Sequence, residues 1–259
     1  MTAFQGTVLV TGASSGIGEA TARAFAAAGA RLILSARRVD RLQTLATEFA
    51  ERHGTETHIV KLDVRDAGVV TRKLEDLPPE WAAIDVLVNN AGLSRGLDRI
   101  HEGSIADWDE MIDTNVKGLL YVTRAVVPGM VERGKGHVIN IGSIAGHEVY
   151  PGGAVYCATK HAVRAITQGL RIDLLGTGVR VTSIDPGMVE TEFSIVRFHG
   201  DRERAARVYE GMQPLTAEDI ADAIVYAATR PAHVNVDEVM VMATAQAGAT
   251  RVHRRSTGE

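Results

Sequence analysis

Two side chains that are able to move a proton lie four residues apart in this sequence. Tyr156 and Lys160 both fall in the stretch 154–175, whose apolar residues follow helical spacing, so the two side chains share one helix face. A free tyrosine has a pKa of about 10 and is a poor acid or base at neutral pH, whereas a neighbouring ammonium favours the phenolate. The pair therefore predicts a phenol that exchanges a proton and an ammonium that lowers its pKa.

A glycine-rich turn near the start of the chain predicts a phosphate-binding loop. The apolar run 7–11 leads into TGASSGIG at residues 11–18, and a helical pattern begins at Glu19. Glycines let the backbone turn tightly beside a pyrophosphate, and a helix N-terminus offers free N–H groups and the positive end of its dipole. The residues expected to contact a dinucleotide here are Gly12, Ser14, Ser15, Gly16, Ile17 and Gly18.

The same turn also matches the G-x-S-x-G nucleophile elbow of α/β-hydrolases. That elbow needs earlier strands and an earlier loop that donates an N–H to the oxyanion. Only 13 residues precede Ser14, so the architecture argues against a hydrolase.

The end of the second apolar run indicates which dinucleotide would bind. An NAD site usually has an acidic residue here, about 20 residues beyond the glycines, to bind the ribose hydroxyls. This chain has Arg37 and Arg38 instead, and guanidinium groups form forked, charge-assisted bonds with phosphate. The nearby Asp40 is interpreted as a carboxylate in the first turn of the next helix. The sequence therefore predicts NADP(H), with its 2′-phosphate, as the cofactor.

Two further polar residues complete a catalytic set. Ser143 follows the apolar run 137–141, and its hydroxyl is suited to bond a carbonyl or alcohol oxygen. Asn115 lies in an earlier helical stretch, where it is expected to hold a relay water. With Tyr156 and Lys160, these residues fit a reaction in which a nicotinamide carries a hydride and the protein exchanges the proton.

Strand and helix patterns alternate along the whole chain, which predicts the α/β class. The short, mostly apolar runs indicate strands buried on both faces, and right-handed crossovers would make them parallel. We expect one Rossmann-type, doubly wound parallel sheet of about seven strands, with helices on both faces. The expected strands are 7–11, 31–35, 58–62, 85–89, 137–141, 179–184 and 238–242, and the expected helices are 19–28, 38–53, 67–77, 106–133, 154–175 and 217–229.

Composition excludes several classes of protein. Of the 259 residues, 45% are hydrophobic and 23% are charged, and the net charge of −4 argues against nucleic acid or an anionic membrane as the main partner. Cys157 is the single cysteine, so no disulfide framework or cysteine-rich zinc site is expected. The histidines form no close cluster in the sequence, and no metal is predicted. The sequence shows no signal peptide or membrane-spanning stretch, and we expect a cytoplasmic protein.

The chain is expected to form one domain over residues 1–259. Residues 187–214 follow a strand end and carry many charges, which predicts a mobile helical lid over the substrate. Residues 248–259 show no core pattern and include Arg251, Arg254 and Arg255. We interpret this tail as a solvated terminus.

Taken together, these motifs resemble the short-chain dehydrogenase/reductase family over essentially the whole chain. The resemblance rests on T-G-x-x-x-G-x-G at 11–18, N-N-A-G at 89–92, the tetrad of Asn115, Ser143, Tyr156 and Lys160, and P-G at 186–187. It implies further cofactor contacts, some of them to the adenine. The implied contacts are Asp63, Val64, Asn90, Ala91, Gly92, Tyr156, Lys160, Pro186, Gly187, Val189 and Thr191.

Segments such as MIDTN at 111–115 and VRF at 196–198 are similar to the NADP-dependent 3-hydroxy acid dehydrogenases of that family, which include malonic semialdehyde reductases. This resemblance implies a homotetramer and a small, acid-bearing substrate held by Ser143 and Tyr156. Its anion needs a cation, for which Arg197 is the first candidate and Arg95 the second. Sulfoacetaldehyde or another short aldehyde is the alternative substrate. A non-catalytic NADP-binding sensor is the alternative class of protein, although a sensor would not need the intact tetrad.

Overall fold

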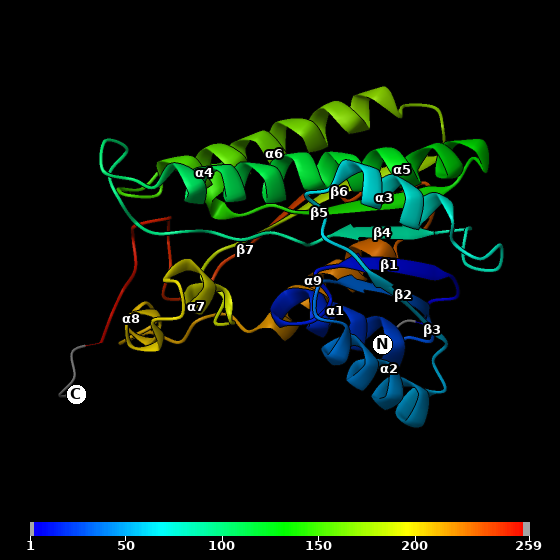
Figure 1. The fold of residues 1–259 in the computed structure, drawn as a ribbon, viewed down its shortest axis with the longest axis horizontal. Coiled ribbons are helices and arrows are strands. Elements are labelled where there is room, and N and C mark those ends of the chain that lie inside the picture. Colours follow the sequence, from blue (N-terminus) through cyan, green and yellow to red (C-terminus); the bar gives the residue numbers. More distant parts are fainter. Residues whose placement is uncertain (1–2, 256–259) are drawn as a thin grey trace.

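The computed structural model, which describes residues 3–255, contains a parallel sheet of seven strands (Figure 1). The strands lie in the order β3-β2-β1-β4-β5-β6-β7, and every neighbouring pair is parallel. This confirms the predicted doubly wound α/β fold. The strands are β1 (Thr7–Thr11), β2 (Arg31–Ala36), β3 (Thr57–Lys61), β4 (Val86–Asn89), β5 (Gly136–Ile141), β6 (Val179–Pro186) and β7 (Glu238–Val241).

Helices cover both faces of this sheet because its strands are apolar on both sides. In β1, Val8 and Val10 face one core, whereas Leu9 faces the other, as the two-residue period of a strand requires. The first core packs against α1 (Gly16–Ala27), α2 (Val39–His53) and α9 (Ala217–Ala228). The second packs against α3 (Ala67–Glu75), α5 (Leu119–Glu132) and α6 (Ala154–Asp173) (Figure 1).

One predicted helix is divided in the structure. The stretch 106–133 forms α4 (Ile105–Ile112), a π-helical turn (Asp113–Gly118) and α5. The wider turn includes Asn115, whose side chain is buried and bonded to Leu93. Apolar periodicity does not reveal such a turn, because one extra residue barely changes the pattern, although π-turns often occur at functional sites.

The predicted lid extends beyond the carboxyl edge of the sheet. It contains two short helices, α7 (Phe193–Arg197) and α8 (Arg202–Arg207), which lie in Figure 1 at the end of the molecule toward which the β4 arrow points. Val189 and Leu215 form a parallel bridge that closes the base of this segment. Over the residues described, no helix is both long and apolar enough to cross a membrane.

A buried histidine in β5 makes the stability of the sheet depend on pH. His137 is 1% exposed, its Nε2 lies 2.7 Å from Thr182 Oγ1 in β6, and burial lowers its pKa from 6.5 to about 3. In the unfolded chain His137 binds a proton near pH 6.5, whereas in the folded chain it binds one only near pH 3. The free energy of unfolding should therefore fall with acidification through this window, by up to about 1.4 kcal/mol per pH unit from this one group.

Chemical denaturation at several pH values measures this contribution. His137→Gln keeps a hydrogen-bonding side chain but removes the titration, so its acid slope should be shallower by about one proton. His101→Gln is the control, because that side chain is 69% exposed. An unchanged slope in His137→Gln would assign the acid sensitivity to other groups.

Candidate active site

A cleft of about 770 Å³ lies at the carboxyl edge of the sheet, where ligands bind in open α/β folds. All the predicted cofactor residues line this cleft except Gly18. A Cβ added to Gly18 would collide with Gly12 O and Asn90 Nδ2, so this glycine lets α1 pack closely against the loop after β1 and the turn after β4. The predicted residues that line the cleft are Gly12, Ser14, Ser15, Gly16, Ile17, Arg37, Arg38, Asp63, Val64, Asn90, Ala91, Gly92, Ser143, Tyr156, Lys160, Pro186, Gly187, Val189, Thr191 and Arg197.

The phosphate loop has the features that an anion site needs. Gly12 has a φ of +67°, which favours glycine, and α1 begins just beyond it. Ser15 is the N-cap residue of α1 but makes no side-chain cap. Its hydroxyl instead accepts a hydrogen bond of 2.7 Å from Arg38. The N-terminal N–H groups of α1 are therefore not capped by that side chain, and they lie at the wall of the cleft.

Thr11 ties this loop to the N-N-A-G turn. Its hydroxyl accepts hydrogen bonds from the backbone N–H groups of Asn90 and Ala91, both at 3.0 Å, and Asn90 Nδ2 donates to Thr11 O at 2.9 Å. These bonds join the ends of β1 and β4 across one edge of the cleft. The two motifs, about 80 residues apart in the chain, are thus parts of one wall.

The two predicted cofactor arginines have different surroundings. Arg38 donates to Ser14 and Ser15 in the phosphate loop and pairs with Glu192 at 3.0 Å. Arg37 also lines the cleft, and within residues 3–255 its guanidinium has no hydrogen bond or ion pair. An unengaged guanidinium at the end of β2 fits a phosphate ligand.

The predicted catalytic residues that line the cleft come from two elements that meet at the end of β5. Ser143 caps a 3₁₀ turn (Ile144–Gly146), and its hydroxyl accepts from Ala145 N at 3.1 Å. Tyr156 and Lys160 lie on α6, as predicted, and both are nine-tenths buried. Lys160 Nζ donates to Ile141 O at 2.8 Å, which attaches α6 to the last residue of β5. The structure therefore brings three of the four predicted catalytic side chains to one cleft.

The fourth, Asn115, lies behind this wall. Its Nδ2 donates to Leu93 O at 2.8 Å and to Thr159 Oγ1 at 3.1 Å, and its Oδ1 accepts from Leu93 N at 2.8 Å. Both amide hydrogens are thus engaged. For a relay water, the side chain can therefore offer only the second lone pair of Oδ1.

The electrostatics of the tyrosine differ from the sequence-based prediction. Burial raises the pKa of Tyr156 well above its ordinary value, and Arg197 and a hydrogen bond with Ser143 offset this only in part. Lys160 was expected to lower that pKa, but its Nζ lies 6.0 Å from the ring centroid and is bonded to Ile141. Burial also lowers the pKa of Lys160, to about 8. The prediction included only the charge of Lys160, whereas desolvation is the main cause of the pKa shift of both Tyr156 and Lys160.

The two candidate substrate cations are separated by the structure. Arg197, on α7, lies over the rings of Tyr156 and Phe193, at 5.4 and 5.1 Å from their centroids. Arg95 lies outside the cleft, where it pairs with Glu110 at 2.7 Å and donates to Val196 O. Arg95 therefore contacts α7 from outside the cleft, and the structure does not bring it to the cleft side.

Comparison with known proteins agrees with this geometry. The family model for short chain dehydrogenase matches residues 6–201. This chain belongs to the short-chain dehydrogenase family. An NADP-dependent 3-hydroxy acid dehydrogenase from Salmonella typhimurium is 53% identical over 249 residues, which cover 95% of this chain and 99% of that protein. Sulfoacetaldehyde reductase 2 from Chromohalobacter salexigens is 49% identical, with 93% and 95% covered.

A solved structure is similarly close to this short-chain dehydrogenase. The closed form of serine dehydrogenase complexed with NADP⁺ is 49% identical and superposes with a TM-score of 0.89. The match covers 96% of this chain and all of that one. The resemblance inferred from the motifs is therefore confirmed at the level of the family and the fold.

Up to residue 255 the tail of this short-chain dehydrogenase is mostly exposed, as interpreted, but its backbone is also hydrogen-bonded to the rest of the chain. His253 N donates to Ala245 O, and Arg255 N donates to Gly211 O, both at 2.8 Å. Arg254 donates to the carbonyls of Val208 and Glu210, just beyond α8. The side chains are exposed as expected, but the backbone pairing that fastens them has no pattern in the sequence. Residues 256–259 lie outside the described range.

Sequence reasoning also missed several residues of the cleft. Tyr150 Oη accepts a 3.1 Å hydrogen bond from Arg197, and Gln246 Oε1 accepts one of 2.8 Å from Met188 N. Ala249, Thr250, Val252 and Arg254 of the tail line the cleft as well. Tyr150 precedes the catalytic helix by four residues, and that proximity was the one available signal.

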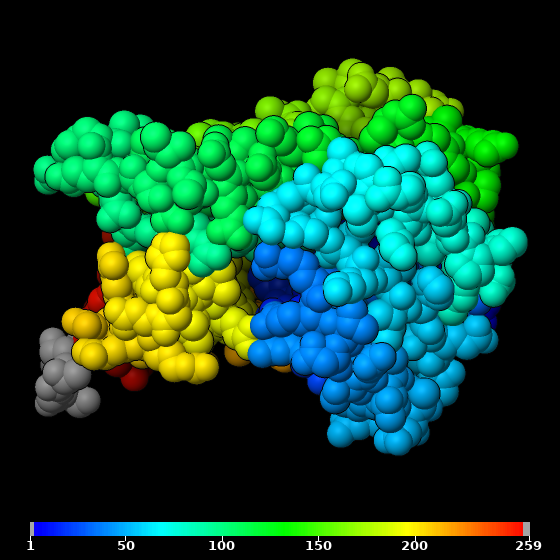
Figure 2. Space-filling model, in the orientation of Figure 1, coloured from blue at the N-terminus to red at the C-terminus, as the bar shows by residue number. Residues whose placement is uncertain are grey.

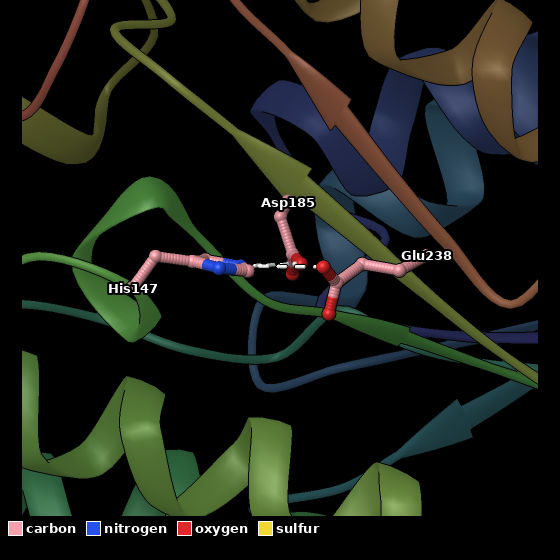
Figure 3. A group of neighbouring side chains, drawn as sticks. All are labelled: His147, Asp185 and Glu238. Atoms are coloured by element: carbon pink, nitrogen blue, oxygen red, sulfur yellow. Dashed lines mark hydrogen bonds and ion pairs between the residues drawn. The ribbon is translucent and has the colours of Figure 1, made fainter.

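Three groups of the kind that bind metals meet beside the cleft, although the sequence predicts no metal. The His147 ring points at the carboxylates of Asp185 and Glu238 (Figure 3), with Nε2 at 2.9 and 3.9 Å from their oxygens. Both carboxylates also have protein donors: Ser183 Oγ bonds Asp185 at 2.7 Å, and Arg164 pairs with Glu238 at 3.1 Å. The arrangement is satisfied as a hydrogen-bonded charge network, and the absence of a metal stays a prediction.

The rate of carbonyl reduction with NADPH should decline as the pH rises through about 8. Tyr156 remains protonated in this range because its pKa is raised, whereas Lys160 loses its ammonium above its pKa of about 8. In Lys160→Arg the cation persists to pH values above about 12, so the residual activity should not decline there. A pH–rate profile of both proteins measures this. A decline centred near pH 8 in both would mean that another group titrates.

Proposed function

We propose that this short-chain dehydrogenase transfers a hydride between NADP(H) and the hydroxyl or carbonyl of a small acid-bearing substrate, such as a serine-like 3-hydroxy acid or malonic semialdehyde. The observation that carries the proposal is Arg197. Its Nε is buried without a hydrogen-bond partner, and no carboxylate in the described part of the chain pairs with it. A guanidinium with a buried, unpartnered Nε beside Tyr156 favours an anionic ligand.

The residues present fit NADP(H) as the cofactor. The uncapped N-terminus of α1 suits a pyrophosphate, and the end of β2 carries Arg37 and Arg38 in place of an acidic residue. A Cβ on Gly12 would lie 3.0 Å from the Ala91 Cα, so the backbone at this point has no room for a side chain. The similar proteins named above as NADP-dependent, or as bound to NADP⁺, support the same choice. When bound, this cofactor supplies or accepts the hydride.

In the proposed mechanism, the side chains of this chain hold the substrate and move the proton. Arg197 and Tyr150 fix the acidic group at the lid, which places the carbonyl toward Ser143 and Tyr156. Ser143 Oγ donates a hydrogen bond to the carbonyl oxygen, and Tyr156 Oη gives it a proton in reduction or removes one in oxidation. Burial keeps Tyr156 protonated at neutral pH. Lys160, fixed on Ile141 O, supplies a positive charge near the phenol.

A second substrate has support from the same cation. A sulfonate is an anion that Arg197 would bind through the same donors, and a sulfoacetaldehyde reductase is 49% identical to this chain. We therefore keep sulfoacetaldehyde as the alternative.

The proposal also places the enzyme in the cytoplasm as a homotetramer, with residues 187–214 as its lid. Exposed large apolar side chains on the outer helices support self-association: Leu120 on α5, Ile172 on α6 and Tyr226 on α9. Light scattering of the purified protein would return the mass of four chains, whereas the mass of one would reject the tetramer.

Absorbance of NADPH during turnover tests the substrate. With malonic semialdehyde, sulfoacetaldehyde and propanal compared at equal concentration, we expect the highest kcat/KM for malonic semialdehyde and little turnover with NADH. A preference for sulfoacetaldehyde would keep the mechanism and change the substrate. A preference for propanal would reject an acid-bearing substrate.

Arg197→Ala should raise KM for malonic semialdehyde by about 10- to 100-fold and leave that for propanal nearly unchanged. This is the loss expected for hydrogen bonds to a charged group, which contribute about 1.5–3 kcal/mol. Arg207→Ala, on α8 of the same segment, is the matched control, because Arg207 is exposed and pairs with Glu203. Equal effects on the acidic and neutral aldehydes would remove Arg197 from the site.

A further inference from the structure

One carboxylate at the start of α7 engages two arginines at the cofactor end of the cleft. Glu192 Oε2 lies 3.0 Å from Arg38 Nη1, and Glu192 Oε1 lies 2.8 Å from Arg41 Nη1. Both of its oxygens are therefore bonded, each to a guanidinium of α2 or its N-cap. We call this group of Glu192, Arg38 and Arg41 the carboxylate bridge.

The bridge joins segments that are far apart in the sequence. Glu192 follows β6 by six residues and is the N-cap residue of α7, whereas Arg38 and Arg41 lie at the start of α2 about 150 residues earlier. Figure 2 shows the yellow lid segment against the blue N-terminal part of the molecule, beside a hollow. Glu192 itself lines the cleft, together with Arg37, Arg38 and Ser14. Glu192 and Arg38 are thus part of the wall where the adenosine end of a dinucleotide would lie, whereas Arg41 lies outside the lining and holds Glu192 from there.

The position of Arg38 defines what the bridge controls. Its Nη2 donates to Ser15 Oγ at 2.7 Å, and its Nε and Nη2 lie 3.2 Å from Ser14 Oγ. Those bonds hold the guanidinium on the phosphate loop, and the Nη1 edge faces Glu192. A carboxylate and a phosphate oxygen use the same guanidinium donors. Glu192 therefore occupies donors that a ribose 2′-phosphate would need.

The charges of the bridge are strongly coupled. Burial acts to raise the pKa of Glu192, but the hydrogen bonds from Arg41 and Arg38 more than offset it, so the pKa lies below its ordinary value. The hydrogen bond to Glu192 raises the pKa of Arg41. Glu192 is thus an anion at neutral pH, and it would repel a phosphate that approaches the same arginines.

We propose that Glu192 is a specificity-determining residue for the cofactor, because its carboxylate, which Arg41 also holds, competes with the 2′-phosphate of NADP(H) for Arg38. Arg37, which has no such partner in the described residues, makes the uncontested contact. Glu192 thereby lowers the affinity for NADP(H) and reduces the ratio of the affinity for NADP(H) to that for NAD(H). The inference rests on the proposed cofactor but holds for any carbonyl substrate.

Binding to the purified full-length protein tests the competition directly. NADPH and NADH are titrated by their fluorescence, and 2′-AMP and 5′-AMP are titrated by calorimetry. In Glu192→Gln, we expect the Kd for NADPH and for 2′-AMP to fall by about three- to tenfold, the range for one or two partly exposed ion pairs. The Kd for NADH and for 5′-AMP should change by less than about twofold, since neither carries a 2′-phosphate.

Glu190→Gln is the matched control. It removes the same charge two residues away, where the side chain is exposed and makes no ion pair within the described chain. If Glu190→Gln increased the affinity for NADPH by a similar factor, the effect would come from the change in net charge alone, and the proposal would be overturned. In an Arg38→Gln, Arg41→Gln background, Glu192→Gln should no longer tighten NADPH, because the contested donors are gone.

Three other results would contradict the proposed role of Glu192. Weaker NADPH binding in Glu192→Gln would mean that Glu192 orients the arginines for phosphate, which is the opposite role. Equal changes for NADPH and NADH would make it a structural residue of the lid. If the unmodified protein failed to prefer NADPH over NADH, the proposed cofactor itself would be wrong, and that failure is visible before any variant is compared.

Discussion

The parallel pairing of β1, β4, β5 and β6 is the constraint on which the rest of this molecule depends. Parallel strands end at the same edge, so residues from four distant parts of the chain meet there without any long connection between them. Short hydrogen bonds then join one strand end to the next: Thr11 binds the turn after β4, and Lys160 holds α6 on the end of β5. The cleft is the space beyond this edge, and residues 187–214 form part of its wall.

Desolvation then determines the protonation behaviour of the side chains that line the cleft. The same burial that raises the pKa of the Tyr156 phenol lowers the pKa of the Lys160 ammonium. It leaves Arg197 with a buried Nε that has no partner within the described chain. A site that contains a neutral acid and an unpaired cation is suited to a substrate that carries both a polar oxygen to protonate and an anion to neutralise. The helices and strands matter to the proposed chemistry because they bury Tyr156 and Lys160.

Much of this arrangement was predictable from the sequence because it follows from short-range patterns. Apolar runs mark strands, a glycine turn marks a phosphate loop, and a four-residue spacing puts Tyr156 and Lys160 on one helix face. The π-turn at Asn115, the engagement of Arg95 by Glu110 and the role of Tyr150 were not predictable, since each depends on a contact between segments that the sequence does not place. The predicted direction of the Tyr156 pKa shift was wrong for a related reason. Burial is a property of the whole fold, whereas a local motif shows only the neighbouring charge.

The segment from Ala245 to Arg255 has a practical consequence for anyone who handles this protein. It crosses from the end of the sheet to α8 and forms part of the wall of the cleft, so the last described residue lies beside the lid. A polyhistidine tag or a fluorescent fusion attached beyond Arg255 would be joined to a segment that forms part of the cleft wall and contacts the residues just after α8. The opposite end of the chain enters through Phe4, which packs on Phe25 at the base of α1, away from the cleft. An attachment that precedes Phe4 would therefore join the chain away from the cleft.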